Sequence, residues 1–168
     1  MKKNILEGYR RAVDIVVEAL KANLGGKLIS IILYGSTARG DVSEDSDIDL
    51  LIVLENLPES RLERIRIFDE VEKRCEGELK SVENEYNIKI FFSPILKTVD
   101  EARKITPLYL DMVEDGIILF DRDDFMKKTI DRVRARLREL GARRIWRGRR
   151  WYWVLKPEVK VGEVLEIE

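Results

Sequence analysis

Two carboxylates separated by one residue, Asp47 and Asp49, begin an apolar run that continues to Leu54. Side chains alternate along a strand, so these two point to the same face, with roughly 6–7 Å between their Cα atoms. Two like charges this close are unfavourable unless a cation lies between them, and carboxylate oxygens are the ligands that Mg²⁺ prefers. The pair therefore predicts a Mg²⁺ site, and carboxylates set this way can bridge the two metal ions of a phosphoryl-transfer centre.

A glycine turn stands ten residues before these carboxylates, at Gly35-Ser36. Glycine lets the backbone approach a ligand, and Ser36 is expected to N-cap a short helix whose free N–H groups favour a phosphate. Arg39 lies on the same turn and can reach that phosphate. We therefore expect Asp47 and Asp49 to hold the metal, while Gly35, Ser36 and Arg39 bind the triphosphate of a nucleotide.

The elements that must position these residues follow from apolar spacing and from helix caps. The expected helices cover 3–24, 36–40, 61–79, 99–105, 107–115 and 121–141, and the expected strands cover 27–35, 47–54, 86–92 and 116–120. Alternating helices and strands predict an α/β sandwich, with a small mixed sheet and helices mainly on one face. Residues 1–122 would form the core domain, and residues 123–168 would pack on it as an amphipathic basic helix and an aromatic tail of loop or edge strands.

Composition narrows the chemistry and the cellular setting. The 168 residues contain no histidine, which excludes Ser-His-Asp and Cys-His catalysis and histidine-ligated zinc. Cys75 is the single cysteine and cannot form an internal disulfide. No signal peptide and no apolar run long enough for a bilayer is evident, so a cytoplasmic protein without membrane contact is expected. A charged fraction of 38% in nearly equal signs is typical of thermophile proteins.

The stretch "GSTARGDVSEDSDID" (35–49), with an apolar strand on each side, resembles the DNA polymerase β-like nucleotidyltransferase superfamily, especially its small single-domain members in archaea and bacteria. The resemblance covers residues 28–54. It implies transfer of a nucleoside monophosphate from a nucleoside triphosphate to an acceptor hydroxyl or another nucleophile. Asp47 and Asp49 would hold the metal ions, and Gly35 and Ser36 would hold the β- and γ-phosphates. The fingerprints of P-loop and dinucleotide-binding proteins are missing.

The same resemblance implies a third carboxylate on a later strand, where it activates the attacking hydroxyl. The expected strand 86–92 carries Asn87 and Lys89 on one face, and Glu85, at the entrance of the strand and in phase with them, is the nearest acid. The alternative function is therefore a catalytically degenerate protein that binds a nucleotide or a partner without transferring anything.

A basic segment, residues 126–150, carries eleven lysines and arginines against two acids, and Trp146, Trp151, Tyr152 and Trp153 lie in or beside it. Basic residues interleaved with aromatics can grip phosphates and stack bases, so an RNA partner is one interpretation. An acidic protein partner is a second. In a third, the helix is an ordinary solvated one, paired with the acidic remainder of the chain, and the aromatic residues fill a small core.

Overall fold

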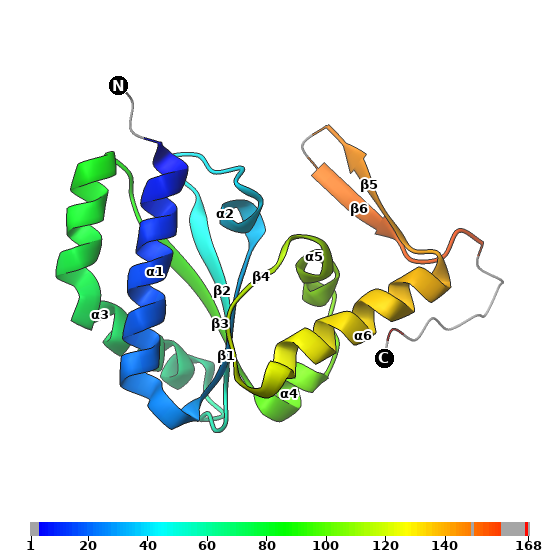
Figure 1. Ribbon diagram of the computed structural model, residues 1–168, viewed down its shortest axis with the longest axis horizontal. Coiled ribbons are helices and arrows are strands. Elements are labelled where there is room, and N and C mark those ends of the chain that lie inside the picture. The colour runs from blue at the N-terminus through cyan, green and yellow to red at the C-terminus, as the bar shows by residue number, and fades with distance from the viewer. Residues whose placement is uncertain (1–3, 149, 159–166, 168) are drawn as a thin grey trace.

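The computed structural model describes residues 4–148, 150–158 and 167, and its centre is a four-stranded mixed sheet (Figure 1). The strands are β1 (Leu28–Tyr34), β2 (Asp47–Leu54), β3 (Phe91–Thr98) and β4 (Ile117–Asp121), in the order β3-β2-β1-β4. Strand β1 pairs antiparallel with β2 and β4, whereas β2 and β3 are parallel. This is the mixed sheet predicted from the sequence.

Helices connect the strands, and a separate hairpin follows the last helix. The helices are α1 (Ile5–Leu24), α2 (Gly35–Arg39), α3 (Arg61–Tyr86), α4 (Val99–Arg103), α5 (Leu108–Asp115) and α6 (Phe125–Leu140), with 3₁₀ turns η1 (Gly25–Lys27) and η2 (Arg122–Asp124). The hairpin consists of β5 (Arg143–Arg147) and β6 (Arg150–Val154). Within the described residues, no helix is long and apolar enough to cross a membrane.

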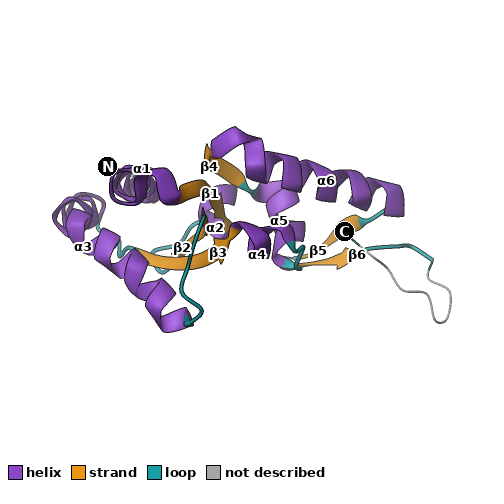
Figure 2. Ribbon diagram, turned by 90° about the horizontal axis from the view of Figure 1, so that it is seen from below, coloured by secondary structure: helices purple, strands orange, loops and turns teal. Residues whose placement is uncertain are grey.

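Helices cover both faces of the sheet, which corrects the prediction that they lie mainly on one (Figure 2). Helices α1 and α3 pack on the face that carries Leu33 and Leu50, and α4, α5 and α6 pack on the face that carries Ile32 and Leu51. The reason is in the central strands: β1 is buried along its whole length, and β2 is buried from Leu50 onward. A strand that is apolar on both faces needs a helical layer on each.

The predicted strand 86–92 is wrong in its position. Helix α3 continues to Tyr86 and ends at Asn87, whose φ of 52° is left-handed, and the strand begins at Phe91. Tyr86, Ile88 and Ile90 are buried at alternate positions, but in a helix end and a connecting segment. Their period of two imitates a strand because alternate side chains of this connection also face the core.

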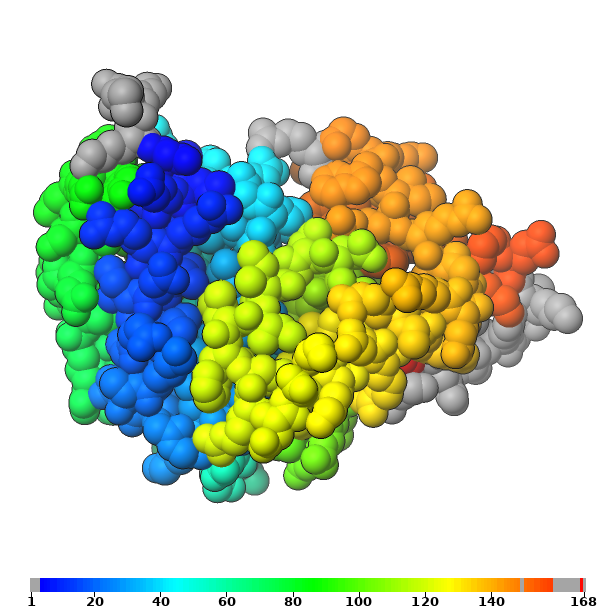
Figure 3. Space-filling model, in the orientation of Figure 1, coloured from blue at the N-terminus to red at the C-terminus, as the bar shows by residue number. Residues whose placement is uncertain are grey.

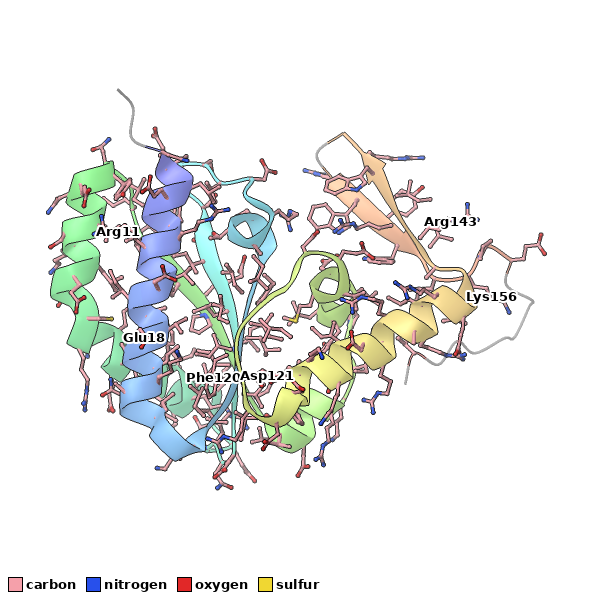
Figure 4. All side chains as sticks on the ribbon, in the orientation of Figure 1. Arg11, Glu18, Phe120, Asp121, Arg143 and Lys156 are labelled. Carbon is pink, nitrogen blue, oxygen red and sulfur yellow. The ribbon has the colours of Figure 1, made fainter. Side chains whose placement is uncertain are left out.

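Helix α6 starts beside the end of β4, where Figure 4 labels Phe120 and Asp121. The Asp121 carboxylate accepts hydrogen bonds from the backbone N–H groups of Met126 and Lys127, at 3.0 and 2.9 Å. The amphipathic character predicted for this segment is confirmed: Met126, Ile130, Val133 and Leu137 of α6 are buried in the cluster shared with the sheet and α5. The tail forms the hairpin up to Val154, and its residues 159–166 lie outside the described part of the chain.

Candidate active site

Asp47 and Asp49 lie at the start of β2, on the face that continues into Leu51 and Val53 beneath α5 and α6. Asp47 is exposed, and Asp49 is partly buried. Asp49 is opposite Tyr34 of β1 in the antiparallel register. The two carboxylates therefore lie together at the solvent-exposed end of β2, next to its buried apolar residues.

Gly35 lies against Asp49. Its φ of 74° is left-handed, and a Cβ added to it would lie 2.1 Å from Asp49 Oδ2. No side chain larger than hydrogen fits there. The chain enters α2 at Gly35, and Tyr34 is the N-cap. The prediction that Ser36 caps this helix is therefore wrong, because Ser36 is its second residue. The Thr37 hydroxyl donates to the Asp47 carbonyl at 3.3 Å, which ties α2 to the first residue of β2.

Burial raises the pKa of Asp49 to about 6; the neighbouring charge of Asp47 adds to this effect, and Arg39 opposes it. Burial, with the charge of Asp49, also raises the pKa of Tyr34 to about 12. Burial is the main cause of both shifts, and neighbouring negative charge adds to each. A cation at the two aspartates would offset the cost of burying that charge.

The loop between α2 and β2 is held by Tyr9 of α1, a side chain with no solvent exposure. Its hydroxyl lies 3.1 Å from the Ser43 carbonyl, and 3.2 Å from the carbonyls of Glu44 and Lys89. Tyr9 lies inside the helix predicted over 3–24, and nothing in the apolar spacing of that helix showed its hydroxyl as an anchor. Through this anchor, α1 fixes the residues that lead directly into Asp47.

Replacing Tyr9 with phenylalanine is expected to lower the free energy of unfolding by about 1–2 kcal/mol, because the three carbonyls lose the single O–H donor that they share. The loosened loop should also slow the reaction by about tenfold, since small misplacements of reacting groups are costly. Urea unfolding and activity measurements check this. Tyr109→Phe is the matched control, because its buried hydroxyl donates to the Ala102 carbonyl. Tyr109→Phe should lower the free energy of unfolding by a similar amount and leave activity unchanged. Equal losses of activity in the two variants would contradict the role of Tyr9 as an anchor of the loop.

Arg39, the last residue of α2, faces the C-terminal hairpin. Its guanidinium lies 4.5 Å from the centre of the Trp151 ring, and its Nη1 lies 3.7 Å from Asp115 Oδ2. Asp115 also binds Arg144 of β5 through both carboxylate oxygens. Sequence reasoning placed Arg39 beside Gly35 and Ser36, but it could not show these partners, which are far away along the chain.

None of the three candidates for the third carboxylate position lies on a strand beside the aspartates. Glu85 belongs to α3 and pairs with Arg11 of α1 at 2.6 Å, Asn87 caps α3, and Lys89 lies in the following loop. In the actual register, β3 instead places Phe91 and Ser93 beside Asp47 and Asp49. The described residues contain no group of three or more acids and cysteines that could hold a metal.

The two carboxylates fit a Mg²⁺ ion by their chemistry. Both are oxygen donors on one face, burial together with the charge of Asp47 raises the pKa of Asp49, and Gly35 places no side chain of its own over the Asp49 oxygen. A cavity of about 510 Å³ is a different feature: it lies along β3 from Pro94 to Lys97 and includes neither aspartate.

The chain is similar to several known proteins. Residues 13–131 match the family model of the nucleotidyltransferase domain. A candidate protein adenylyltransferase of Methanocaldococcus jannaschii is 32% identical over 130 residues, which cover 76% of this chain and 82% of that protein. A second such protein of the same organism is 54% identical over 43 residues, 26% of this chain and 43% of that protein. A toxin–antitoxin structure with AMP-PNP superposes with a TM-score of 0.46 at 20% identity, over 76% of this chain and 91% of that one.

Proposed function

Since this chain belongs to the nucleotidyltransferase domain family, we propose that it is a Mg²⁺-dependent enzyme whose metal ligands are Asp47 and Asp49. One observation carries the proposal: the two carboxylates share a face at the start of β2, and Gly35 lies so close to Asp49 that a Cβ would collide with it. A glycine at a positive φ lets the backbone lie directly against the carboxylate, and in this proposal a metal-bound phosphate chain approaches the same turn.

In this proposal one group of residues holds the metal and another binds the phosphates. Asp47 and Asp49 hold the metal, and Gly35, Ser36 and Arg39 bind and orient the β- and γ-phosphates. Bound Mg²⁺ would neutralise the charge that develops on the phosphoryl oxygens. The acceptor oxygen forms a bond to the α-phosphorus, the bond from that phosphorus to its bridging oxygen breaks, and pyrophosphate leaves. The hydroxyl proton passes to solvent, because no third carboxylate lies beside the pair among the described residues.

Our choice of nucleotide and acceptor rests on the relatives named above, which are candidate protein adenylyltransferases. We therefore propose ATP as the donor and a protein side chain as the acceptor, in a cytoplasmic reaction. The exposed side of the hairpin, with Arg143, Arg147 and Arg150, suits an acidic protein surface better than a neutral one. RNA is the competing acceptor, and a degenerate protein that binds nucleotide without transferring it is the competing function.

The test is to follow two labels of the same nucleotide. The protein is incubated with ATP labelled at either the α- or the γ-phosphorus, with Mg²⁺ or with a chelator, and with separate protein and RNA fractions of a cell extract. We expect the α-label, and not the γ-label, to reach a protease-sensitive product when Mg²⁺ is present. A label that ribonuclease removes would identify RNA as the acceptor. Binding of ATP without any transfer would favour the degenerate alternative, and transfer that survives chelation would refute the metal dependence.

A further inference from the structure

The hairpin of β5 and β6 has two different faces. Trp146 and Trp151 are directly paired across the strands, as are Arg144 and Trp153, so these four side chains lie on one face. This inner face is turned toward α5 and α2, while Arg143, Ile145, Arg147, Arg150 and Tyr152 belong to the outer face. Figure 3 shows the orange hairpin against the yellow-green α5 region and close to the cyan segment that contains α2.

The inner face is fixed to α5 by two aspartates. The indole N–H groups of Trp151 and Trp153 both donate to Asp111 Oδ1, at 2.8 and 3.2 Å. Arg144 binds both carboxylate oxygens of Asp115, and the side chains of Arg144 and Asp115 are 15% and 12% exposed. A planar guanidinium on a carboxylate is a bidentate, directional contact, so the hairpin has a defined orientation on α5.

The Arg39 side chain also reaches the contact between the hairpin and α5, and it comes from α2. Its side chain is 19% exposed, with the Trp151 ring on one side and Asp115 on the other. In the described part of the chain it makes no hydrogen bond, since 3.7 Å to Asp115 is too long for one. One carboxylate thus faces two guanidinium groups, and Arg144 already occupies both of its oxygens. Asp115 therefore neutralises the charge of Arg39 only in part, and the N–H groups of Arg39 can donate to a further anion.

We infer that the hairpin completes the nucleotide site, with Trp151 and Asp115 as positioning residues that hold the Arg39 guanidinium for the triphosphate. This rests on the proposed function, in which Arg39 binds phosphate. An arginine side chain at the end of a five-residue helix has many rotamers, and ordering it on binding costs affinity. Stacking on an indole ring fixes the plane of the guanidinium before the nucleotide arrives and leaves its edges to donate.

Calorimetric titration with ATP and Mg²⁺ tests the role of Trp151. Trp151→Leu should weaken ATP binding by about fivefold to tenfold, which is the range of a partly desolvated cation–π contact. Trp151→Phe keeps a ring over Arg39 and should bind within about twofold of the wild type. Trp151→Leu should leave the affinity for AMP unchanged, because AMP has no β- or γ-phosphate for Arg39 to bind. A general loosening of the fold would weaken both ligands.

Two further variants separate this inference from the proposed function. Arg39→Ala should weaken ATP binding at least as much as Trp151→Leu, and the double variant should be no weaker than Arg39→Ala alone, because the two act as one unit. Tyr152→Leu is the matched control: it removes an exposed aromatic from the outer face of the same strand and should change nothing. Losses that multiply in the double variant, or unchanged ATP binding in Trp151→Leu, would overturn the positioning role while the proposed function stands. A wild-type protein that binds no ATP would overturn both.

Discussion

Replacing Asp47 or Asp49 with asparagine should slow nucleotidyl transfer by about a thousandfold, because an amide neither carries the charge nor ligates Mg²⁺ as a carboxylate does. Stabilisation of the transition state by a metal is worth several kcal/mol, and each 1.36 kcal/mol is about tenfold in rate. The rate of α-label transfer from ATP measures this loss directly. Activity that survives in both variants would contradict a role of the pair in holding the metal.

The same two variants should differ in stability, which provides an internal control. Asp49 is partly buried and its pKa is raised from 3.8 to about 6, so the folded protein binds its proton more tightly than the unfolded chain does. Its contribution to stability is therefore complete below about pH 4 and is lost as the pH rises through 6. Above that pH the charged carboxylate destabilises the metal-free fold, by about 1–2 kcal/mol after allowance for solvent screening.

Asp49→Asn should consequently be more stable than the wild type at pH 7.5, with a melting temperature about 2–8 °C higher in the absence of metal. This advantage should largely disappear near pH 3.5, where the wild-type carboxyl is mostly protonated in both states. Asp47→Asn, at an exposed position, should lose activity without this gain. Thermal unfolding at the two pH values, with a chelator present, checks both. A destabilised Asp49→Asn at neutral pH would show that burial of the charge is not what raises the pKa.

The second large effect is expected at Gly35. Gly35→Ala should reduce transfer by about a hundredfold, because the new Cβ would lie 2.1 Å from Asp49 Oδ2 and the carboxylate must move away. A displacement of about 1 Å of a reacting group is enough for a loss of this size. The substitution also puts a side chain at a φ of 74°, which costs roughly 1 kcal/mol of stability.

Gly40→Ala separates the effect of the collision with Asp49 from the effect of the positive φ. Gly40 ends the same helix α2 with a φ of 75°, but the nearest atom to its added Cβ is Leu6 Cδ2 at 3.5 Å, an ordinary contact. It should show the same loss of stability in urea unfolding, with most of the activity retained. If Gly35→Ala and Gly40→Ala were equally active, the contact with Asp49 would have no role in the reaction.

The sequence was informative where a local pattern decides the structure. The strands that flank 35–49 followed from their apolar runs, and the bounds of β2 were predicted to the residue. Thr98 and Glu101 form a capping box at the start of α4, where a helix was predicted from residue 99. The position of Asp47 and Asp49 on one face is a matter of strand alternation alone. These features depend on neighbours within a few residues, which the sequence displays directly.

The predictions were wrong or incomplete where contacts between residues far apart in the sequence determine the structure. Alternation at Tyr86, Ile88 and Ile90 reports burial, and a helix end followed by a packed connection is buried just as a strand is. The register of β3 beside β2 depends on the length of α3, so the residues next to Asp49 could not be identified from the sequence. The partners of Arg39 come from α5 and β6, and a basic segment with tryptophans gave no sign of which of its residues would meet it.

The distance along the chain between Arg39 and Trp151 has a consequence during synthesis. The aspartates, the glycine turn and the β1–β2 pair lie within the first 54 residues, while the hairpin follows about a hundred residues later. A protein leaves the ribosome from its N-terminus. The carboxylate pair can therefore form on a nascent chain well before the arginine acquires its aromatic partner, so tight retention of a nucleotide should be one of the last properties that a newly made molecule acquires.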